Sequence, residues 1–226
     1  MDKALIIAAI LIALGGGYAL FTYSKRAALP PAPLQELQVT TASEREEADT
    51  YTIDAEYPQF GMPEIDAKIK ERVGLSIAQF KKDAAEGPPP PDSVVQQYEF
   101  VSRFDSAYVG PDIVSAQIVT SSYMGGAHPM PIVNGLNFDR ATGRDIALVD
   151  AFSMVGLSLE EIAEKAKKEL QDKLGSDIIA PEGAGPTPEN YSTFVIDKDR
   201  VTFIFQVYQV GPYSAGPQEV PFQRVR

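Results

Sequence analysis

Tyr98-Glu-Phe-Val-Ser-Arg-Phe-Asp-Ser-Ala-Tyr108-Val-Gly-Pro-Asp112-Ile113 is the stretch from which the fold class follows. Its aromatic residues recur at even spacing with serines between them, which is the period of one face of a β-strand. Gly110-Pro-Asp112 is a turn signal, and the apolar run from Ile113 to Tyr123 predicts a second strand that returns beside the first. The sequence therefore predicts an antiparallel hairpin at the centre of the chain.

The residues before this hairpin predict one strand and one helix. Tyr51 to Tyr57 alternates apolar and polar side chains, as a half-buried strand does, and Pro58 is expected to end it. Pro63 suits the first turn of a helix, and apolar residues then recur at helical spacing up to Gly87. The prolines of Gly87-Pro-Pro-Pro-Pro91 predict an extended connector between this helix and the hairpin.

The residues after the hairpin predict further strands and a second helix. Ile132 to Asp139 is expected to be a strand that ends in a turn. Ser158 and Glu161 form a capping box before an apolar stripe that ends at Gly175. Segments 191–196 and 201–210 predict another hairpin, and 221–225 an edge strand. The predicted fold class is α+β: antiparallel sheets with two packed helices, preceded by one N-terminal transmembrane helix.

The N-terminal segment is expected to direct the chain to a membrane. No charged residue occurs from Ala4 to Tyr23, and a helix of that length spans a bilayer. The small residues Gly17 and Ala19 leave a cleaved signal peptide as the alternative. The predicted organisation is an anchor or signal over 1–24, a Pro- and Glu-rich linker over 25–49, and α+β subdomains over 50–124 and 125–226.

Composition restricts the chemistry that the chain can perform. Its 226 residues include no cysteine and one histidine, which excludes thiolate nucleophiles, iron–sulfur ligation and His-rich metal sites. The net charge is −11, and the residues beyond Arg26 carry −13. Such a surface repels nucleic acid and attracts basic partners, although solubility alone also accounts for it. No cofactor and no metal site is predicted.

The stretch Tyr123-Met-Gly-Gly-Ala-His128-Pro holds the lone histidine on a loop. Neither a nucleophile elbow nor a second histidine is available to it, so a structural or recognition role is favoured over catalysis. Tyrosine presents both a ring and a hydroxyl to a partner, and Tyr208 and Tyr213 lie beside glycine-rich loops as Tyr123 does. The candidate partner surface is therefore Tyr123, His128, Tyr208 and Tyr213, with core packing of the rings as the alternative.

Several motifs together resemble one family of bacterial proteins. These are Tyr123-Met-Gly-Gly-Ala-His128, Asn137-Phe-Asp139, Leu148-Val-Asp-Ala-Phe152 and the run from Phe205 to Gly216. The resemblance, over about residues 50–226, is to the domain beside the catalytic module of PdaC-type peptidoglycan deacetylases and to the ectodomain of the lysozyme-sensing anti-sigma factor RsiV. On this resemblance, 50–124 is PdaC-like and 125–226 is RsiV-like.

The resemblance implies a location outside the cytoplasmic membrane and a binding function. The metal-binding residues of the deacetylase module have no counterpart in a chain with one histidine, so an accessory domain and not an enzyme is expected. The expected partner is peptidoglycan, another envelope component, or a basic protein such as lysozyme. The alternatives are an envelope glycan hydrolase that uses carboxylates such as Asp139 and Asp145, and a purely architectural protein without an aromatic-lined groove.

Overall fold

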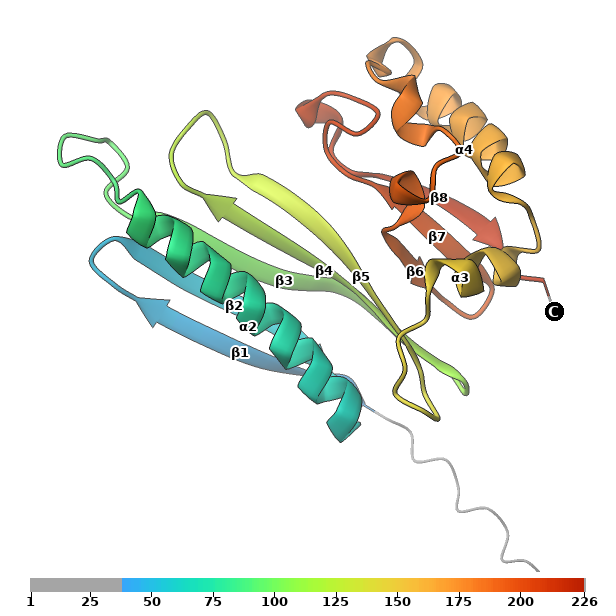
Figure 1. Cartoon of the computed structure of the whole chain (residues 1–226), viewed down its shortest axis with the longest axis horizontal. Coiled ribbons are helices and arrows are strands. Elements are labelled where there is room, and N and C mark those ends of the chain that lie inside the picture. The colour runs from blue at the N-terminus through green and yellow to red at the C-terminus, as the bar shows by residue number, and fades with distance from the viewer. Residues whose placement is uncertain (1–37, 226) are drawn as a thin grey trace, which may run out of the picture. The chain divides into compact units, whose positions relative to one another are not determined.

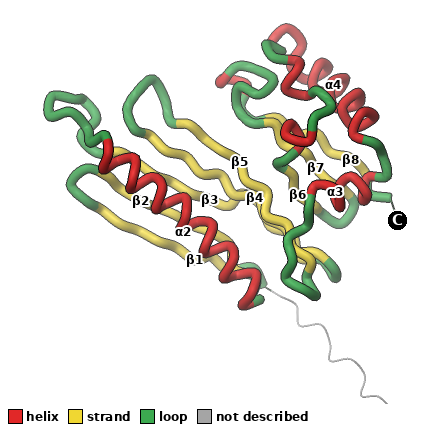
Figure 2. Tube along the Cα trace, in the orientation of Figure 1, coloured by secondary structure: helices red, strands yellow, loops and turns green. Residues whose placement is uncertain are grey.

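A computed structural model describes residues 38–225. Five strands form one sheet in the order β1-β2-β3-β4-β5 (Figures 1 and 2). The strands are β1 (Thr40–Glu47), β2 (Tyr51–Gln59), β3 (Tyr98–Val109), β4 (Ile113–Tyr123) and β5 (Met130–Asp139). The predicted hairpin is present as β3 and β4, joined by the tight turn at Gly110.

The long helix α2 (Pro63–Glu86) covers one face of this sheet. It begins at the predicted proline, and its buried stripe of Ile65, Ile69, Val73, Ile77 and Phe80 packs against inward-facing residues of β2, β3 and β4. Asp66 stabilises the first turn by accepting hydrogen bonds from the backbone N–H groups of Phe60 (2.7 Å) and Met62 (2.9 Å). Burial of this stripe is the main reason for the position of α2.

The first sheet is mixed, and the prediction of purely antiparallel sheets is wrong in this respect. Strand β2 pairs with β3 in parallel, with Tyr51 opposite Tyr98 and Ala55 opposite Ser102. The reason is the crossover through α2 and the proline connector, which returns the chain to the end of the sheet where β2 began. The sequence pattern of each strand is the same for either direction, so it does not reveal the parallel pair.

A second sheet has three antiparallel strands in the order β6-β7-β8: Phe194–Ile196, Arg200–Phe205 and Gln218–Gln223. Helices α3 (Leu148–Val155) and α4 (Leu159–Leu174) pack on it around a core that contains Tyr191, Phe203 and Phe205. The predicted capping box of Ser158 and Glu161 begins α4. Short 3₁₀ turns lie at Gly175–Asp177, Pro181–Ala184, Pro188–Tyr191 and Tyr213–Ala215.

Three expectations for this region need correction. The described residues contain three α-helices, whereas two were predicted; the short helix α3 is the additional one. The predicted strand 201–210 ends at Phe205, after which the chain turns at residues 206–209. The predicted strand 191–196 is only β6, since Tyr191 belongs to a 3₁₀ turn.

Strand pairing crosses the predicted domain limits. The segment 25–49, expected to be a linker, includes β1, which pairs along its whole length with β2. The predicted limit at 124/125 falls between β4 and β5, which pair from Ser122 and Met130 to Ile113 and Asp139. Residues from β1 to β8 cluster as one compact unit.

Buried polar groups join the two sheets. The Ser115 hydroxyl donates to Asn137 Oδ1 (2.7 Å) and accepts from the Ile196 N–H (3.1 Å). Asn137 Nδ2 donates to the Phe194 carbonyl at 2.8 Å. Gly135 of β5 lies so close to β6 that a Cβ atom there would be 1.8 Å from the Phe194 carbonyl oxygen. Both sheets therefore depend on the same few residues at β4, β5 and β6.

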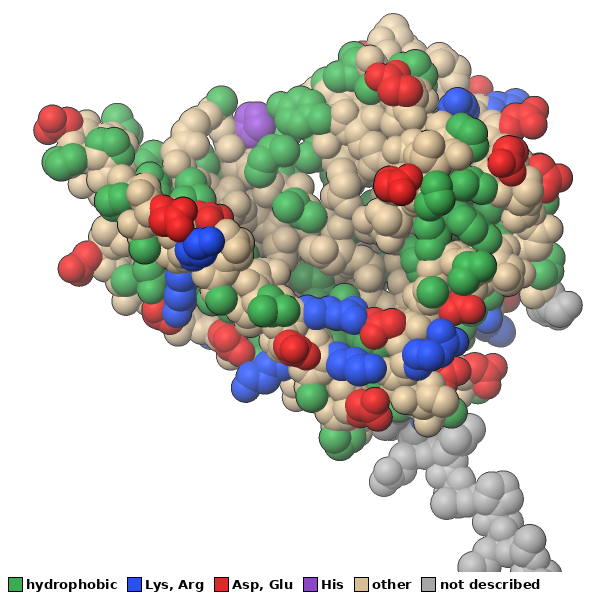
Figure 3. All heavy atoms as spheres, in the orientation of Figure 1, with side chains coloured by type: hydrophobic (Ala, Val, Ile, Leu, Met, Phe, Trp, Pro, Cys, Tyr) green, Lys and Arg blue, Asp and Glu red, His purple; other side chains and the backbone are tan. Residues whose placement is uncertain are grey.

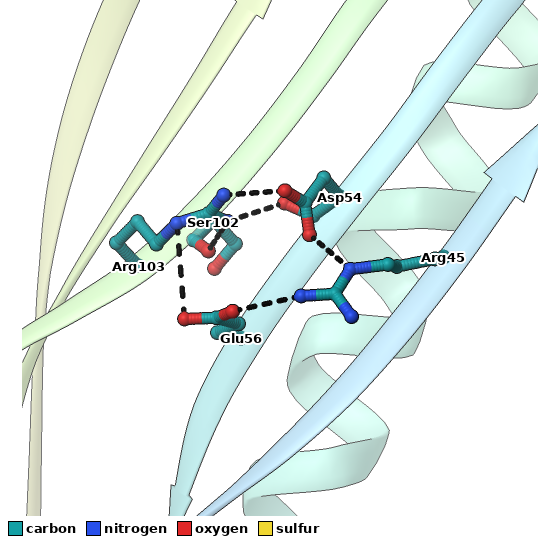
Figure 4. A network of polar contacts seen from close by, with 5 residues as sticks. All are labelled: Arg45, Asp54, Glu56, Ser102 and Arg103. Carbon is teal, nitrogen blue, oxygen red and sulfur yellow. Dashed lines mark hydrogen bonds and ion pairs between the residues drawn. The ribbon is translucent and has the colours of Figure 1, made fainter.

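Four charged side chains cross the outer face of β1, β2 and β3 (Figure 4). Arg45 contacts Asp54 and Glu56, both at 3.0 Å, and Arg103 contacts the same two carboxylates from the other side. The hydrogen bond from Arg103 is the first cause that holds the pKa of Asp54 below its usual range, and Arg45 adds to it. The network links the edge strand to its neighbours.

The predicted membrane segment, 1–24, lies outside the described residues. Within residues 38–225, none of the helices has the length and apolar character needed to cross a bilayer.

Candidate functional site

Two loops bring three of the four predicted site residues together. His128 lies in the loop between β4 and β5, and Tyr208 and Tyr213 lie in the segment between β7 and β8. The rings of His128 and Tyr213 are stacked, with centroids 3.7 Å apart and planes inclined by 25°. Tyr208 Oη lies 3.2 Å from His128 Nε2, and its ring centroid is 5.9 Å from that of Tyr213. We call His128, Tyr208 and Tyr213 the aromatic cluster.

Hydrogen bonding assigns the protons of the cluster. His128 Nδ1 lies 3.0 Å from the Pro129 carbonyl, which only accepts, so this nitrogen carries a proton. In the neutral imidazole Nε2 is then an acceptor, and the Tyr208 hydroxyl donates to it. The Tyr213 hydroxyl also donates to the Pro129 carbonyl, at 2.9 Å. Both tyrosine hydroxyls are therefore used internally, and the ring faces are what the cluster offers to a ligand.

Tyr123 supports the loop and does not join the cluster. Its hydroxyl donates to the Gly126 carbonyl at 2.9 Å, across the bend of the loop. Gly125 and Gly126 have φ of 86° and 115°, a conformation that residues with a Cβ rarely adopt. The Gly-Gly pair thus lets the loop fold back onto Tyr123 and carry His128 toward the second sheet.

Tyr208 has an unusual backbone conformation and is 46% exposed. Its φ is 65°, the only positive value for a non-glycine residue in the described part of the chain. A left-handed conformation costs such a residue about 1–2 kcal/mol, so the surrounding structure must impose it. Strain of this kind often occurs at functional positions.

Two glutamines that were not among the predicted site residues impose the position of Tyr208. Gln206 Oε1 accepts from the Val133 N–H (2.9 Å) while its Nε2 donates to the Val133 carbonyl (2.8 Å). Gln209 Nε2 donates to the carbonyls of Gly183 (2.9 Å) and Asn190 (3.0 Å). Two glutamines within an otherwise apolar strand pattern, on either side of Val207-Tyr208, were the available signal.

Asp139 and Asp145, the carboxylates considered for a hydrolase, and the nearby Asp150 have separate structural contacts. Asp139 accepts from the backbone N–H (2.8 Å) and the hydroxyl (2.7 Å) of Thr142, and the hydroxyl contact is the first cause that lowers the pKa of Asp139. Asp145 pairs with Arg72 and Lys68 of α2. Asp150 accepts from the Ala147 N–H (3.0 Å) and pairs with Arg144. A lowered pKa does not suit Asp139 to the role of general acid.

Asp139 and Asp150 nevertheless line one cleft of about 400 Å³, together with Asp112, Arg144 and Arg224. A larger cleft of about 590 Å³ lies between β3–β4 and β6–β8, with five charged residues in its lining: Asp105, Lys173, Asp197, Arg200 and Glu219. Within residues 38–225, no three His, Asp or Glu side chains are grouped as a metal ion requires.

A third cleft, of about 450 Å³, lies on the side of the first sheet that α2 covers. Its apolar lining includes Leu75 of α2 and Met124, Met130 and Ile132 from the ends of β4 and β5. Met124 and Met130 border the loop that carries His128, so this cleft and the aromatic cluster share one loop. The histidine, purple in Figure 3, lies beside apolar side chains at the edge of a hollow in the same face as α2.

Comparisons with known proteins find similarity to two family models and to a solved structure. Residues 44–131 match the family model "Deacetylase PdaC", and residues 153–224 match "Protein of unknown function (DUF3298)". The solved structure of a DUF3298 family protein from Pseudomonas aeruginosa PAO1 superposes with a TM-score of 0.56 at 16% identity, over 84% of this chain and 91% of that one. At this identity the likeness shows a shared fold.

Two curated relatives align with this chain over only part of their own length. Peptidoglycan-N-acetylmuramic acid deacetylase PdaC of Bacillus subtilis strain 168 is 23% identical over 77% of this chain and 38% of its own length. Immunogenic protein MPT64 of Mycobacterium tuberculosis strain H37Rv is 27% identical over 42% of each. The chain thus spans less than half the length of the curated relatives it matches.

Proposed function

We propose that this protein is a non-catalytic binding module for the cell envelope and that its ligand is peptidoglycan. The match to a PdaC-like domain followed by a DUF3298 domain supports this proposal. The observation that carries this proposal is the aromatic cluster, three rings held on two loops at the surface. A purely architectural protein has no need of a strained, exposed tyrosine fixed by two glutamines. The relative named as a peptidoglycan deacetylase supports the choice of ligand.

The rings are suited to a sugar surface. Their hydroxyls are satisfied within the protein, so the exposed ring faces present apolar area without unpaired donors. The cluster is preorganised, because the stack of His128 and Tyr213 and the anchors of Tyr208 are already formed. Preorganisation reduces the entropy lost on binding.

Co-sedimentation with purified peptidoglycan sacculi tests the proposal on the full chain in mild detergent. His128→Ala and Tyr213→Ala remove the two stacked rings, and we expect each to weaken binding about tenfold, the effect of roughly 1.4 kcal/mol. Val149→Ala, on the exposed side of α3, is the matched control and is expected to bind as the parent chain does. Circular dichroism verifies that the variants fold. Parent chain that stays in the supernatant would exclude peptidoglycan as the ligand.

A basic protein such as a lysozyme-type muramidase is the second candidate ligand. The net charge of −11 favours it, since a field of that sign raises the rate at which a basic protein associates. Retention of lysozyme that disappears between low and moderate salt, and is unchanged in Tyr213→Ala, would indicate this charge-driven mode. Absence of lysozyme retention at low salt removes this candidate.

The proposal includes a location outside the cytoplasmic membrane with the N-terminal segment as anchor. The apolar run from Ala4 to Tyr23 and the relative named as a peptidoglycan deacetylase support it. Cleavage of the domain by a protease added to spheroplasts is the expected result, and complete protection would contradict this location.

A further inference from the structure

The uncovered part of the first sheet forms a surface trough next to the aromatic cluster. We define the trough by Leu75, Met124, Met130 and Ile132, which line the third cleft. Leu75 is 65% exposed and Ile132 54%, an unusual exposure for large apolar side chains that share one cleft. Exposed apolar residues gathered in this way commonly mark binding surfaces, whereas single ones need no explanation.

The trough exists because α2 covers only part of the sheet. Inward-facing residues such as Ile118 and Leu136 are buried beneath the helix. Further along the same two strands, β4 continues with Thr120 and Ser122 and β5 with Ile132 and Met130, which α2 leaves partly exposed. This exposed end of the sheet adjoins the loop that carries His128.

The polar part of the trough consists almost wholly of hydroxyl and amide groups. Its charged member is Asp83, whose carboxylate already accepts a hydrogen bond from Gln79 Nε2 at 2.7 Å. The other polar lining residues are Ser76, Gln79, Thr120, Ser121 and Ser122. Charged residues make up 23% of the chain, which has a net charge of −11, but among the described residues Asp83 is the one charged residue in this lining. The lining is therefore suited to a neutral ligand and not to a basic one.

Thr120 in this lining, and Asn134 next to it on β5, have only weak partners in the protein. Asn134 Nδ2 lies 3.5 Å from both Thr120 Oγ1 and the Ile132 carbonyl, and Thr120 Oγ1 lies 3.4 Å from that carbonyl. Contacts of this length are near the limit of hydrogen bonding. A ligand with its own hydroxyl and amide groups can therefore replace these contacts without loss.

We infer that the trough and the aromatic cluster together bind an uncharged, N-acetylated glycan strand several sugars long. The cluster holds one sugar on its ring faces, and the trough holds the neighbouring sugars on apolar side chains with hydroxyl and amide groups beside them. Continuity through the loop from Met124 to Met130 is the reason for assigning one ligand to both. This inference rests on the proposed binding of peptidoglycan and specifies which part of it is recognised.

Isothermal titration of the full chain with N-acetylglucosamine oligomers of one to six sugars tests the inference. We expect affinity to rise at least tenfold with length and then to level off once the surface is filled. Ile132→Lys and Leu75→Lys place a charge in the trough and are expected to abolish this gain, while short oligomers bind as before. Val149→Lys, at a side chain with 67% exposure on α3, is the matched control.

The outcomes separate the inference from the function on which it rests. Sacculi that bind through His128 and Tyr213, with oligomer affinity independent of length or unaffected by Ile132→Lys, would overturn the inference and leave the proposed function intact. Failure to bind both sacculi and oligomers would overturn both. Equal affinity for fully deacetylated, cationic oligomers of the same length would also contradict a neutral-glycan site.

Discussion

At the scale of single residues, Tyr208 shows how tertiary contacts hold a surface residue in a backbone conformation that it does not favour. Its left-handed backbone is unfavourable for tyrosine, and its side chain remains nearly half exposed. The hydrogen bonds of Gln206 and Gln209 hold this conformation, which the local sequence does not favour. Local propensity therefore suggested a strand through residue 210, because the deciding contacts come from Val133 and Gly183, far away in the sequence.

Replacing Tyr208 separates the strain from the ring. Glycine adopts a φ of 65° without penalty, and alanine does not. We expect Tyr208→Gly to be about 1 kcal/mol more stable than Tyr208→Ala in urea unfolding, the reverse of the usual order, and both to bind sacculi less well than the parent chain. An alanine variant at least as stable as the glycine variant would show that the left-handed conformation is not enforced.

At the scale of elements, local signals predicted some segments and failed for others. Ser158, Glu161 and Gly175 begin and end α4 through contacts within a few residues, so its limits were predicted from the sequence. Strand β1 was missed because Ser43-Glu-Arg-Glu-Glu47 is polar on both faces. Such a sequence becomes a strand only when β2 supplies its hydrogen bonds and Asp54 and Glu56 pair with Arg45.

The charged network on these strands predicts a dependence on pH. The folded state lowers the pKa of Asp54, so its contribution to stability is present above the unfolded value near 3.8 and is lost as pH falls through the folded value. Asp54→Asn is expected to lower the free energy of unfolding at pH 7 by less than about 1 kcal/mol, because the pairs are partly exposed. Urea unfolding at pH 7 and pH 2.5 measures the difference.

The matched control is Asp105→Asn, at the bulge of β3, where we find no ion pair among residues 38–225. This substitution is expected to have little effect at either pH. A cost of Asp54→Asn that persists unchanged at pH 2.5 would mean that its charge is not the cause.

At the scale of the whole described unit, the candidate site depends on how the two sheets meet. His128 comes from the first sheet and both tyrosines from beyond β7, so the cluster forms only if β5 and β6 stay packed against each other at Gly135, Asn137 and Phe194. Sequence reasoning proposed these residues, with Tyr123, as one partner surface, but it did not predict the contacts among the rings, since residues 128 and 208 are joined by no local pattern. The parallel pair of β2 and β3 was missed for the same reason.

Gly135 tests this junction. A methyl group there would overlap the Phe194 carbonyl, and overpacking of this kind costs about 3 kcal/mol. We expect Gly135→Ala to lower the free energy of unfolding by about that amount and to weaken binding of sacculi. Gly74→Ala is the control: it lies within α2 with no atom within 4 Å of the added Cβ, so it should raise stability by about 0.5–1 kcal/mol. A Gly135→Ala protein as stable as the parent would rule out this close approach of the sheets.

The bond between Gln206 and Val133 has a further consequence, for self-association. An edge strand has unpaired backbone N–H and C=O groups that can hydrogen-bond to a strand of another chain, and such pairing can start fibre formation. At Val133 the glutamine amide already occupies both groups, and two positions earlier Pro131 has no N–H to give. The same side chain that fixes the binding loop therefore also stops the sheet from growing, which lets the protein expose an apolar surface without polymerising through that border.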